Sequence, residues 1–198
     1  MALSIYQLKG QFQQLLSPLL AGLIRYKISP NQITLFTLFL GLFFGLGLIS
    51  FSTNRWLWAA FPLFMLLRMA LNAVDGMLAN QTNQKTKLGS VLNEMCDHVS
   101  DIVLYLPFAF IASINVPLIV TIIIATLLAE IAGLMAVVLG AQRCFDGPMG
   151  KSDRAFSFSI AAICIALKIQ PIWVNGLLAL ILVLLFLTIY NRLKQALR

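Results

Sequence analysis

The sequence predicts an all-α integral membrane protein, built as a bundle of six transmembrane helices with an N-terminal amphipathic helix at the membrane surface. Hydrophobic residues make up 60% of the 198-residue chain and charged residues only 11%, whereas about a quarter of the residues in soluble domains are charged. Apolar runs long enough to cross about 30 Å of hydrocarbon recur along the whole chain. They favour a helical bundle over a barrel of short alternating strands.

The charge and cysteine content exclude two other classes of function. The net charge of +7 comes from basic residues scattered between apolar runs, so we expect no nucleic-acid partner. Cys96, Cys144 and Cys164 show no paired spacing, which argues against a disulfide framework or a zinc site. The first 25 residues mix polar with apolar residues and lack the pattern of a cleavable signal, so the first span would serve as the insertion signal.

The N-terminal segment, residues 4–26, repeats apolar residues at helical spacing with polar residues between them. We expect this segment to lie along the membrane as an amphipathic helix, and packing against the bundle is the close alternative. The chain is therefore divided into a juxtamembrane helix over residues 1–28 and a six-helix membrane domain over residues 29–198.

Six apolar spans follow a helix-start signal. Ser29 is expected as the N-cap, Pro30 occupies the first helical position, and Gln32 completes a capping box. Pro107 is expected to kink the third span. The spans cover about residues 33–51, 57–78, 88–111, 117–139, 155–169 and 172–190.

The distribution of basic residues predicts the orientation. Six spans place both termini on one side of the membrane, and that side carries eleven basic residues, whereas the other side carries Arg55 and Lys168. By the positive-inside rule, both termini and the acidic stretch described next face the cytoplasm. We expect a multi-pass protein of the inner (cytoplasmic) membrane, in contact with membrane lipids.

The polar stretch from Asn72 to Asp101 is the main candidate site. It holds four of the seven acidic residues of the chain between apolar runs, and ionisable groups at membrane depth are costly and usually functional. Helical spacing places Asn72 with Asp75 on one helix face, and Asn93 with Asp97 and Asp101 on a face of the next helix.

Oxygen-bearing side chains that meet from two helices suit a divalent cation. Carboxylate and amide oxygens are hard ligands for Mg²⁺, Mn²⁺ or Ca²⁺. Gly76 and Gly89 remove side chains beside these ligands and would let a phosphate or a nucleotide approach the backbone. A cation that bridges phosphate oxygens, with a carboxylate as base, supports attack of an alcohol on phosphorus.

The spacing N-x2-D-G-x2-A-N-x8-G-x3-N-x3-D over residues 72–97 resembles the motif of the CDP-alcohol phosphatidyltransferases, D-x2-D-G-x2-A-R-x8-G-x3-D-x3-D, at every interval. The Ser29-Pro30-Asn31 approach and the six-span layout are also similar to that family. The resemblance implies cleavage of the diphosphate of a CDP-linked lipid or alcohol, transfer of the substituted phosphate to a hydroxyl acceptor, release of CMP, and homodimers in the membrane.

The resemblance also implies a role for each matched acid or amide. Asn72, Asp75, Asn93 and Asp97 would form the shell of one or two Mg²⁺ or Mn²⁺ ions, with Asp101 on the same face one turn further. Asp97 would be the catalytic base that deprotonates the acceptor hydroxyl.

Other matched positions are expected to contact the substrate. The segment around Lys151 and Arg154 resembles the place where the family holds a phosphate, although an ordinary basic loop explains both residues equally well. Four residues would line the CDP pocket: Gly76, Ala79, Asn80 and Gly89.

Three asparagines depart from the family pattern. Asn72 and Asn93 stand where the family has aspartate, and Asn80 replaces an arginine. Because the pattern also resembles a bacterial branch with asparagine at the first two positions, an active enzyme is the leading interpretation. The alternatives are a catalytically silent relative that binds CDP-lipid, a small transporter or channel, and polar contacts that only join helices or form a proton path.

Three charged residues outside the motif pattern have structural interpretations. We expect Arg68, in the middle of a span, to pair with Glu130 or with another acid of the bundle. His98, which follows Asp97, is more consistent with a structural histidine than with one that tunes Asp101.

Overall fold

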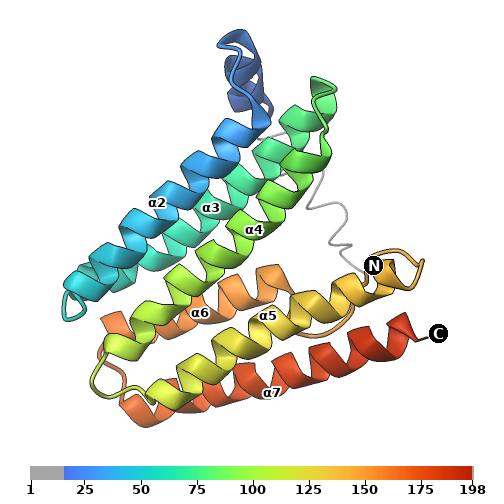
Figure 1. The fold of residues 1–198 in the computed structure, drawn as a ribbon. Coiled ribbons are helices and arrows are strands. Elements are labelled where there is room, and N and C mark those ends of the chain that lie inside the picture. Colours follow the sequence, from blue (N-terminus) through green and yellow to red (C-terminus); the bar gives the residue numbers. More distant parts are fainter. Residues whose placement is uncertain (1–15, 198) are drawn as a thin grey trace, which may run out of the picture. The chain divides into compact units, whose positions relative to one another are not determined.

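The computed structural model describes residues 16–197, and all regular elements in this range are helices. The helical segment Leu16–Arg25 precedes them, and Figure 1 shows the remaining elements along the chain. This confirms the predicted all-α class. The elements are α2 (Pro30–Ser50), α3 (Arg55–Gln81), α4 (Lys87–Tyr105), the 3-10 helix η1 (Leu106–Phe110), α5 (Val116–Val138), α6 (Lys151–Ala166) and α7 (Pro171–Ala196).

Helix α2 begins at the predicted capping box. The backbone N–H of Ser29 donates to Gln32 Oε1 at 2.8 Å, and the backbone N–H of Gln32 donates to Ser29 Oγ at 3.3 Å. Pro30 is the first helical residue, where its missing N–H costs nothing. Two N–H groups that have no partner inside the helix are thereby satisfied, which fixes the start of α2 beside the motif helices.

Pro107 changes the type of helix in the third predicted span. The α-helical part ends at Tyr105, and the chain continues as η1 with Pro107 in its first turn. Proline lacks the N–H for an i→i−4 bond and its ring clashes with the preceding turn. The kink expected at this position therefore takes the form of a 3-10 segment.

Four helices, α2, α3, α5 and α7, are long and apolar enough to cross a membrane. Within residues 16–197, α4 and α6 do not meet the same conditions, because α4 carries Glu94, Asp97 and Asp101 and α6 has only 16 residues. The structure therefore supports a membrane protein with at least four candidate spans among the described residues.

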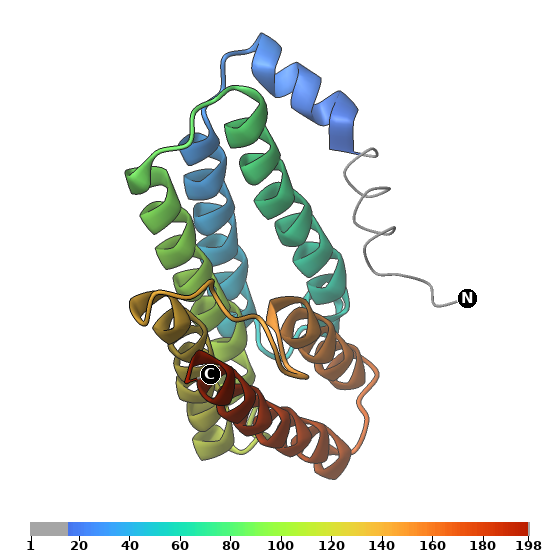
Figure 2. The same ribbon diagram turned by 90° about the vertical axis from the view of Figure 1, so that its right-hand side faces the viewer.

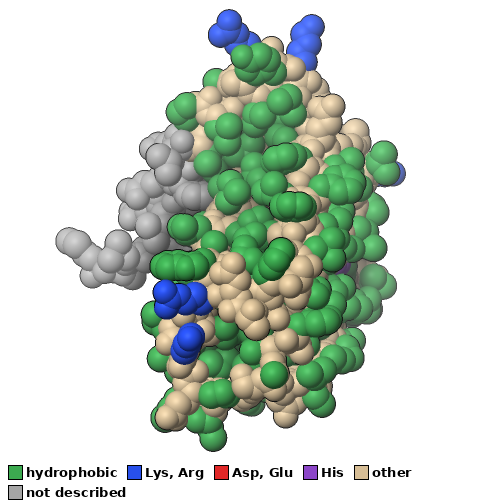
Figure 3. Space-filling view, turned by 90° about the vertical axis from the view of Figure 1, so that its left-hand side faces the viewer, with side chains coloured by type: hydrophobic (Ala, Val, Ile, Leu, Met, Phe, Trp, Pro, Cys, Tyr) green, Lys and Arg blue, Asp and Glu red, His purple; other side chains and the backbone are tan. Residues whose placement is uncertain are grey.

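The exposed surface is rich in large apolar side chains. Phe43 is 80% exposed and Leu63 is 70% exposed, and Figure 3 shows a face on which hydrophobic side chains predominate. Contiguous apolar surface of this kind needs a cover, and the lipid of a membrane provides one for the outside of a helical bundle.

The chain forms two compact units, each assembled from parts of several helices. Of the described residues, the first unit contains those up to Gly41 together with Leu66–Val99, and the second contains Leu42–Met65 together with those from Ser100 onward. Each unit therefore has its own core.

In the first unit, the core joins the described part of the N-terminal segment to α2 and α3. Leu20, Ile33, Val74 and Leu78 form this core, and Leu20 is only 1% exposed. The segment Leu16–Arg25 therefore packs on helices, which was the alternative that the sequence left open. Residues 1–15 lie outside the described range, so a surface position for that part stays a prediction.

In the second unit, aromatic rings form the centre of the core. Trp58 meets Phe108 edge to face with ring centroids 4.8 Å apart, and Tyr105 stacks on Phe158 at 3.9 Å. The edge-to-face arrangement is a favoured geometry for aromatic pairs. Helices α5 and α7 lie side by side in this unit (Figures 1 and 2).

Gly45 marks a close approach of α2 and α4 within the second unit. A Cβ at position 45 would lie 2.6 Å from Val103 Cγ1 and 2.7 Å from the Val103 backbone oxygen. Small residues let membrane helices approach closely. Gly47 lies two residues further along the same helix, on another face, and a Cβ there would meet no atom within 4 Å.

We predict that Gly45→Ala destabilises the protein and that Gly47→Ala does not. Overpacking against a backbone oxygen costs about 1–3 kcal/mol, whereas an unhindered Gly→Ala change is neutral or stabilises by about 0.4–1 kcal/mol. Thermal unfolding in detergent, followed by circular dichroism, compares the two variants. Equal melting temperatures for both would contradict the close approach.

Candidate functional site

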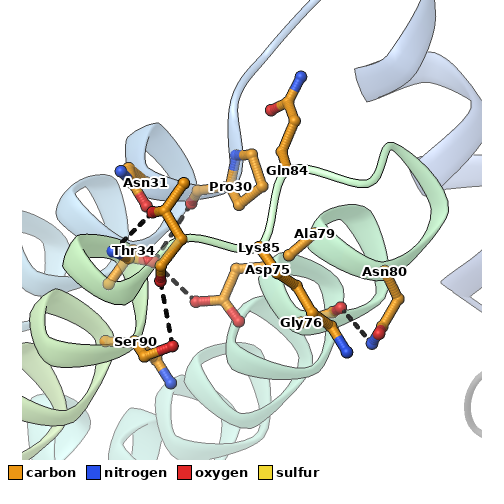
Figure 4. A pocket seen from close by; sticks show the side chains of 13 residues that line it. Pro30, Asn31, Thr34, Asp75, Gly76, Ala79, Asn80, Gln84, Lys85 and Ser90 are labelled. Carbon is orange, nitrogen blue, oxygen red and sulfur yellow. Dashed lines mark hydrogen bonds between the residues drawn. The ribbon is translucent and has the colours of Figure 1, made fainter.

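A cavity of about 310 Å³ lies in the first unit, where α2 begins, α3 ends and α4 begins (Figure 4). Six residues that the sequence singled out belong to its lining, together with residues of the α3–α4 loop. The lining residues are Pro30, Asn31, Thr34, Asp75, Gly76, Ala79, Asn80, Gln84, Lys85, Thr86, Gly89, Ser90 and Asn93.

Asp75 is the acid in the cavity wall. Its side chain points toward α2 in Figure 4, and its Oδ2 accepts a hydrogen bond from Thr34 Oγ1 at 2.8 Å. The residue is only 4% exposed, so this bond offsets part of the cost of burying a carboxylate. Gly76 follows, and a Cβ there would meet no atom within 4 Å, so its missing side chain leaves space open at the cavity.

Gly89 lines the cavity from α4 and permits close packing. A Cβ at position 89 would lie 2.9 Å from Asn31 Oδ1 and 3.1 Å from Thr86 Oγ1. The Gly89 N–H donates to the same Thr86 hydroxyl at 2.9 Å, which satisfies one free donor in the first turn of α4. The glycine thus lets α2 and α4 approach each other at the cavity.

Asn93 brings an unsatisfied oxygen to the site. Its Oδ1 is buried and has no hydrogen-bond partner among the residues that the structure describes. Buried polar atoms are normally satisfied, so an exception calls for a ligand, a water or an ion. A divalent cation bound to Asp75 and Asn93 would satisfy this oxygen with ligands of a suitable kind.

The donor set fits a cation that also takes ligands from the substrate. Within residues 16–197, no three His, Cys, Asp or Glu side chains cluster as a metal site. Mg²⁺ in phosphate-handling sites commonly uses one or two carboxylates, several waters and substrate phosphate oxygens. One carboxylate and one amide oxygen are therefore compatible with such an ion.

Asp97 lies outside the cavity lining, one helical turn beyond Asn93. Asn72 Nδ2 donates to Asp97 Oδ1 at 2.5 Å. Arg68 Nη2 lies 3.6 Å from the same oxygen and donates to the Asp97 backbone oxygen at 3.0 Å. Arg68 therefore pairs with an acid of the bundle, as expected. That acid is Asp97, and Glu130 pairs with other arginines.

Asp101 and Arg154 have a structural role in the second unit. Arg154 Nη2 lies 3.1 Å from Asp101 Oδ2 and 2.9 Å from Glu130 Oε1, and the Arg154 side chain is fully buried. This buried guanidinium, paired with two carboxylates, is part of the core of the second unit. The structure therefore does not favour the expected roles of Asp101 as a metal ligand and of Arg154 as a phosphate contact, whereas Lys151 is exposed at the start of α6.

Glu130 forms ion pairs with three arginines in the same unit. Its carboxylate lies 3.0 Å from Arg143, 2.9 Å from Arg154 and 3.4 Å from Arg192. Arg192 also donates to the Ala129 backbone oxygen at 2.6 Å. This network connects α5, α6, α7 and the segment after α5, and it offsets the burial of several charges together.

The hydrogen bond of Asn80 and the place of Lys85 in the cavity lining were not predicted from the sequence. The Asn80 amide donates to the Gly76 backbone oxygen at 2.8 Å, and Figure 4 shows this bond along α3. Lys85 lines the cavity, and its place in the polar loop between the two halves of the motif was the sequence feature that could have indicated this.

His98 pairs with Glu94 at 3.1 Å within α4, which is consistent with its expected structural role.

Known proteins have sequences similar to that of this chain. The inner membrane protein YnbA of Escherichia coli K12 is 40% identical over 196 residues, which are 98% of this chain and 97% of YnbA. A phosphatidylinositol phosphate synthase of Corynebacterium glutamicum is 33% identical over 89 residues, which are 45% of this chain and 39% of the synthase.

Solved structures of the Mycobacterium tuberculosis phosphatidylinositol phosphate synthase share the fold at 17% identity. The structure with CDP-DAG bound has a TM-score of 0.79 and aligns over 92% of this chain and 94% of that one. The structure with manganese and citrate has a TM-score of 0.78 and aligns over 91% and 88%. The model of the CDP-alcohol phosphatidyltransferase family matches residues 27–190, and the chain therefore belongs to this enzyme family.

Proposed function

We propose that the chain transfers a phosphatidyl or other substituted phosphate group from a CDP-linked substrate, such as CDP-diacylglycerol, to the hydroxyl of an alcohol, with release of CMP and dependence on a divalent ion. One observation carries the proposal. Six residues at family-motif positions line a single cavity of about 310 Å³, a volume in the usual range of small-molecule sites. They are Asp75, Gly76, Ala79, Asn80, Gly89 and Asn93.

In the proposed mechanism, Asp75 and Asn93 hold the ion, which is Mg²⁺ or Mn²⁺. When bound, the ion neutralises charge on the phosphate oxygens. The Thr34 hydroxyl keeps the Asp75 carboxylate oriented through the 2.8 Å hydrogen bond. Gly76 leaves the cavity wall free of a side chain, so the CDP diphosphate can approach the backbone there, whereas Gly89 lets α2 and α4 approach each other.

Asp97 is proposed as the base. The acceptor oxygen attacks the phosphorus that carries the lipid, the bond from that phosphorus to CMP breaks, and the hydroxyl proton passes to the Asp97 carboxylate. Arg68 and Asn72 hold this carboxylate from one side. Proximity and a fixed orientation of this kind account for much of the rate that such sites achieve.

Lys85 is proposed as a cation for the diphosphate. The family pattern has arginine where this chain has Asn80, and the Asn80 amide is bonded to its own helix. Lys85 lines the same cavity and brings a positive charge from the α3–α4 loop. Lys151, which is exposed at the start of α6, is proposed to contact an acceptor or lipid phosphate.

The proposal includes the finer arrangement in the membrane. We infer six membrane-spanning helices, so that α4 and α6 also cross the membrane. Both termini and the cavity face the cytoplasmic side of the inner membrane. The protein acts as a homodimer, as the family resemblance implies.

A catalytically silent relative is the second candidate function. Asn72, Asn80 and Asn93 remove two negative charges and one positive charge from the family pattern, and this observation favours binding of CDP-lipid without turnover. The two candidates differ in one measurable respect. A silent protein would bind CDP-diacylglycerol and release no CMP, and it would gain activity when aspartate is restored at positions 72 and 93.

The first prediction concerns turnover. Purified protein in detergent, supplied with CDP-diacylglycerol, Mg²⁺ or Mn²⁺ and a panel of alcohols, is expected to release CMP. Asp75→Asn should lower the rate by roughly 10²–10³-fold, because it removes the charged ligand from the cavity. Asp146→Asn is the matched control, since Asp146 is exposed in the other unit. CMP release that is equal in the wild type and Asp75→Asn would overturn the proposal.

The second prediction concerns Lys85. Lys85→Met should raise the KM for the CDP-linked substrate by about 10-fold, which corresponds to the loss of one charge-assisted hydrogen bond. Lys87→Met is the control, because Lys87 is exposed nearby and does not belong to the cavity lining. Initial rates over a range of CDP-diacylglycerol concentrations measure both variants. A similar KM for the two variants would remove Lys85 from the site.

A further inference from the structure

Arg68 is an unusual residue in the motif region because its guanidinium is buried beside the proposed base. Arg68 is 4% exposed and Asp97 is 6% exposed. Arg68 Nη2 lies 3.6 Å from Asp97 Oδ1 and 3.0 Å from the Asp97 backbone oxygen. The two contacts place a permanent positive charge against Asp97 inside the first unit.

Asn72 contacts the same carboxylate oxygen as a donor. Its Nδ2 lies 2.5 Å from Asp97 Oδ1, so an N–H group is directed at the position where a cation would bind this oxygen. An aspartate at position 72 would place a second carboxylate there, and two adjacent carboxylates attract a cation. An amide at this position instead satisfies the oxygen without one.

The net charge of the site also argues against a second cation beside Asp97. Around the two acids, the carboxylates of Asp75 and Asp97 and the guanidinium of Arg68 leave one net negative charge, since Asn72 and Asn93 are neutral. One divalent ion reverses this charge, and together with Lys85 of the cavity lining it leaves a positive excess for the diphosphate. A second ion next to Asp97 would lie close to the Arg68 guanidinium, and like charges in a water-poor site repel strongly.

We propose that Arg68 and Asn72 together take the place of a second cation at Asp97, so that the motif of this chain binds a single divalent ion. Asp75 and Asn93 hold that ion. The inference rests on the proposed metal-dependent function of the same site. Arg68 is therefore a positioning residue, which acts through Asp97 and sets the number of ions.

The experiment counts ions directly. Wild-type protein in detergent is titrated with Mn²⁺ alone, and electron paramagnetic resonance measures the bound fraction and any coupling between ions. We expect one Mn²⁺ per chain and a spectrum without Mn–Mn coupling. The double variant Arg68→Gln/Asn72→Asp should bind two Mn²⁺ ions with a coupled spectrum, because two-metal sites hold their ions about 3.5–4 Å apart.

Two controls separate this effect from general charge and from misfolding. Arg55→Gln/Asn83→Asp makes the same two exchanges at exposed positions and should still bind one ion. Arg68→Lys keeps the positive charge and should also bind one ion, with the circular dichroism spectrum and melting profile of the wild type. Arg68→Lys thus tests the inference even if the double variant fails to fold.

The possible results distinguish this inference from the proposed function. Two coupled ions in the wild type, with CMP release intact, would overturn the inference and leave the transferase function standing. A single ion in a folded Arg68→Gln/Asn72→Asp variant, or a second ion in Arg68→Lys, would also overturn it. No Mn²⁺ binding together with no CMP release in the same wild-type preparation would mean that the proposed function itself is wrong.

Discussion

Buried carboxylates are the constraint on which the rest of the structure depends. An ionised carboxylate in an apolar helical protein is costly unless another group compensates for its lost hydration. Each of the four buried acids meets this condition through a partner on another segment of its own unit. The pairs are Asp75 with Thr34, Asp97 with Arg68 and Asn72, Asp101 with Arg154, and Glu130 with Arg143, Arg154 and Arg192.

The partners separate the acids of the site from the acids of the scaffold. Asp75 accepts a hydrogen bond from the Thr34 hydroxyl and lies in the cavity wall, where a carboxylate is a suitable ligand for a divalent cation. Asp101 and Glu130 have guanidinium partners and are committed to the core of the second unit. Asp97 has both a charged partner, Arg68, and a neutral one, Asn72, and it lies one turn beyond the cavity lining. A transferase site and a stable bundle can therefore use the same residue type.

Local chemistry made much of this predictable from the sequence. The capping box at Ser29 and the break at Pro107 depend on neighbouring residues only, and both are found. The motif and its resemblance to a known family singled out six residues that line the cavity, and their roles in binding stay predictions. The contacts of Arg154 with Asp101 and of Arg192 with Glu130 join residues more than 50 positions apart. No local pattern encodes such pairs.

The most direct test of the account is a crystal structure with Mn²⁺ and CDP-diacylglycerol, with the ion located by anomalous scattering. The account predicts one anomalous peak, bound by an Asp75 carboxylate oxygen and by Asn93 Oδ1, with the diphosphate in the cavity beside Gly76 and Lys85. A nucleotide bound elsewhere, or an ion that contacts neither Asp75 nor Asn93, would contradict it.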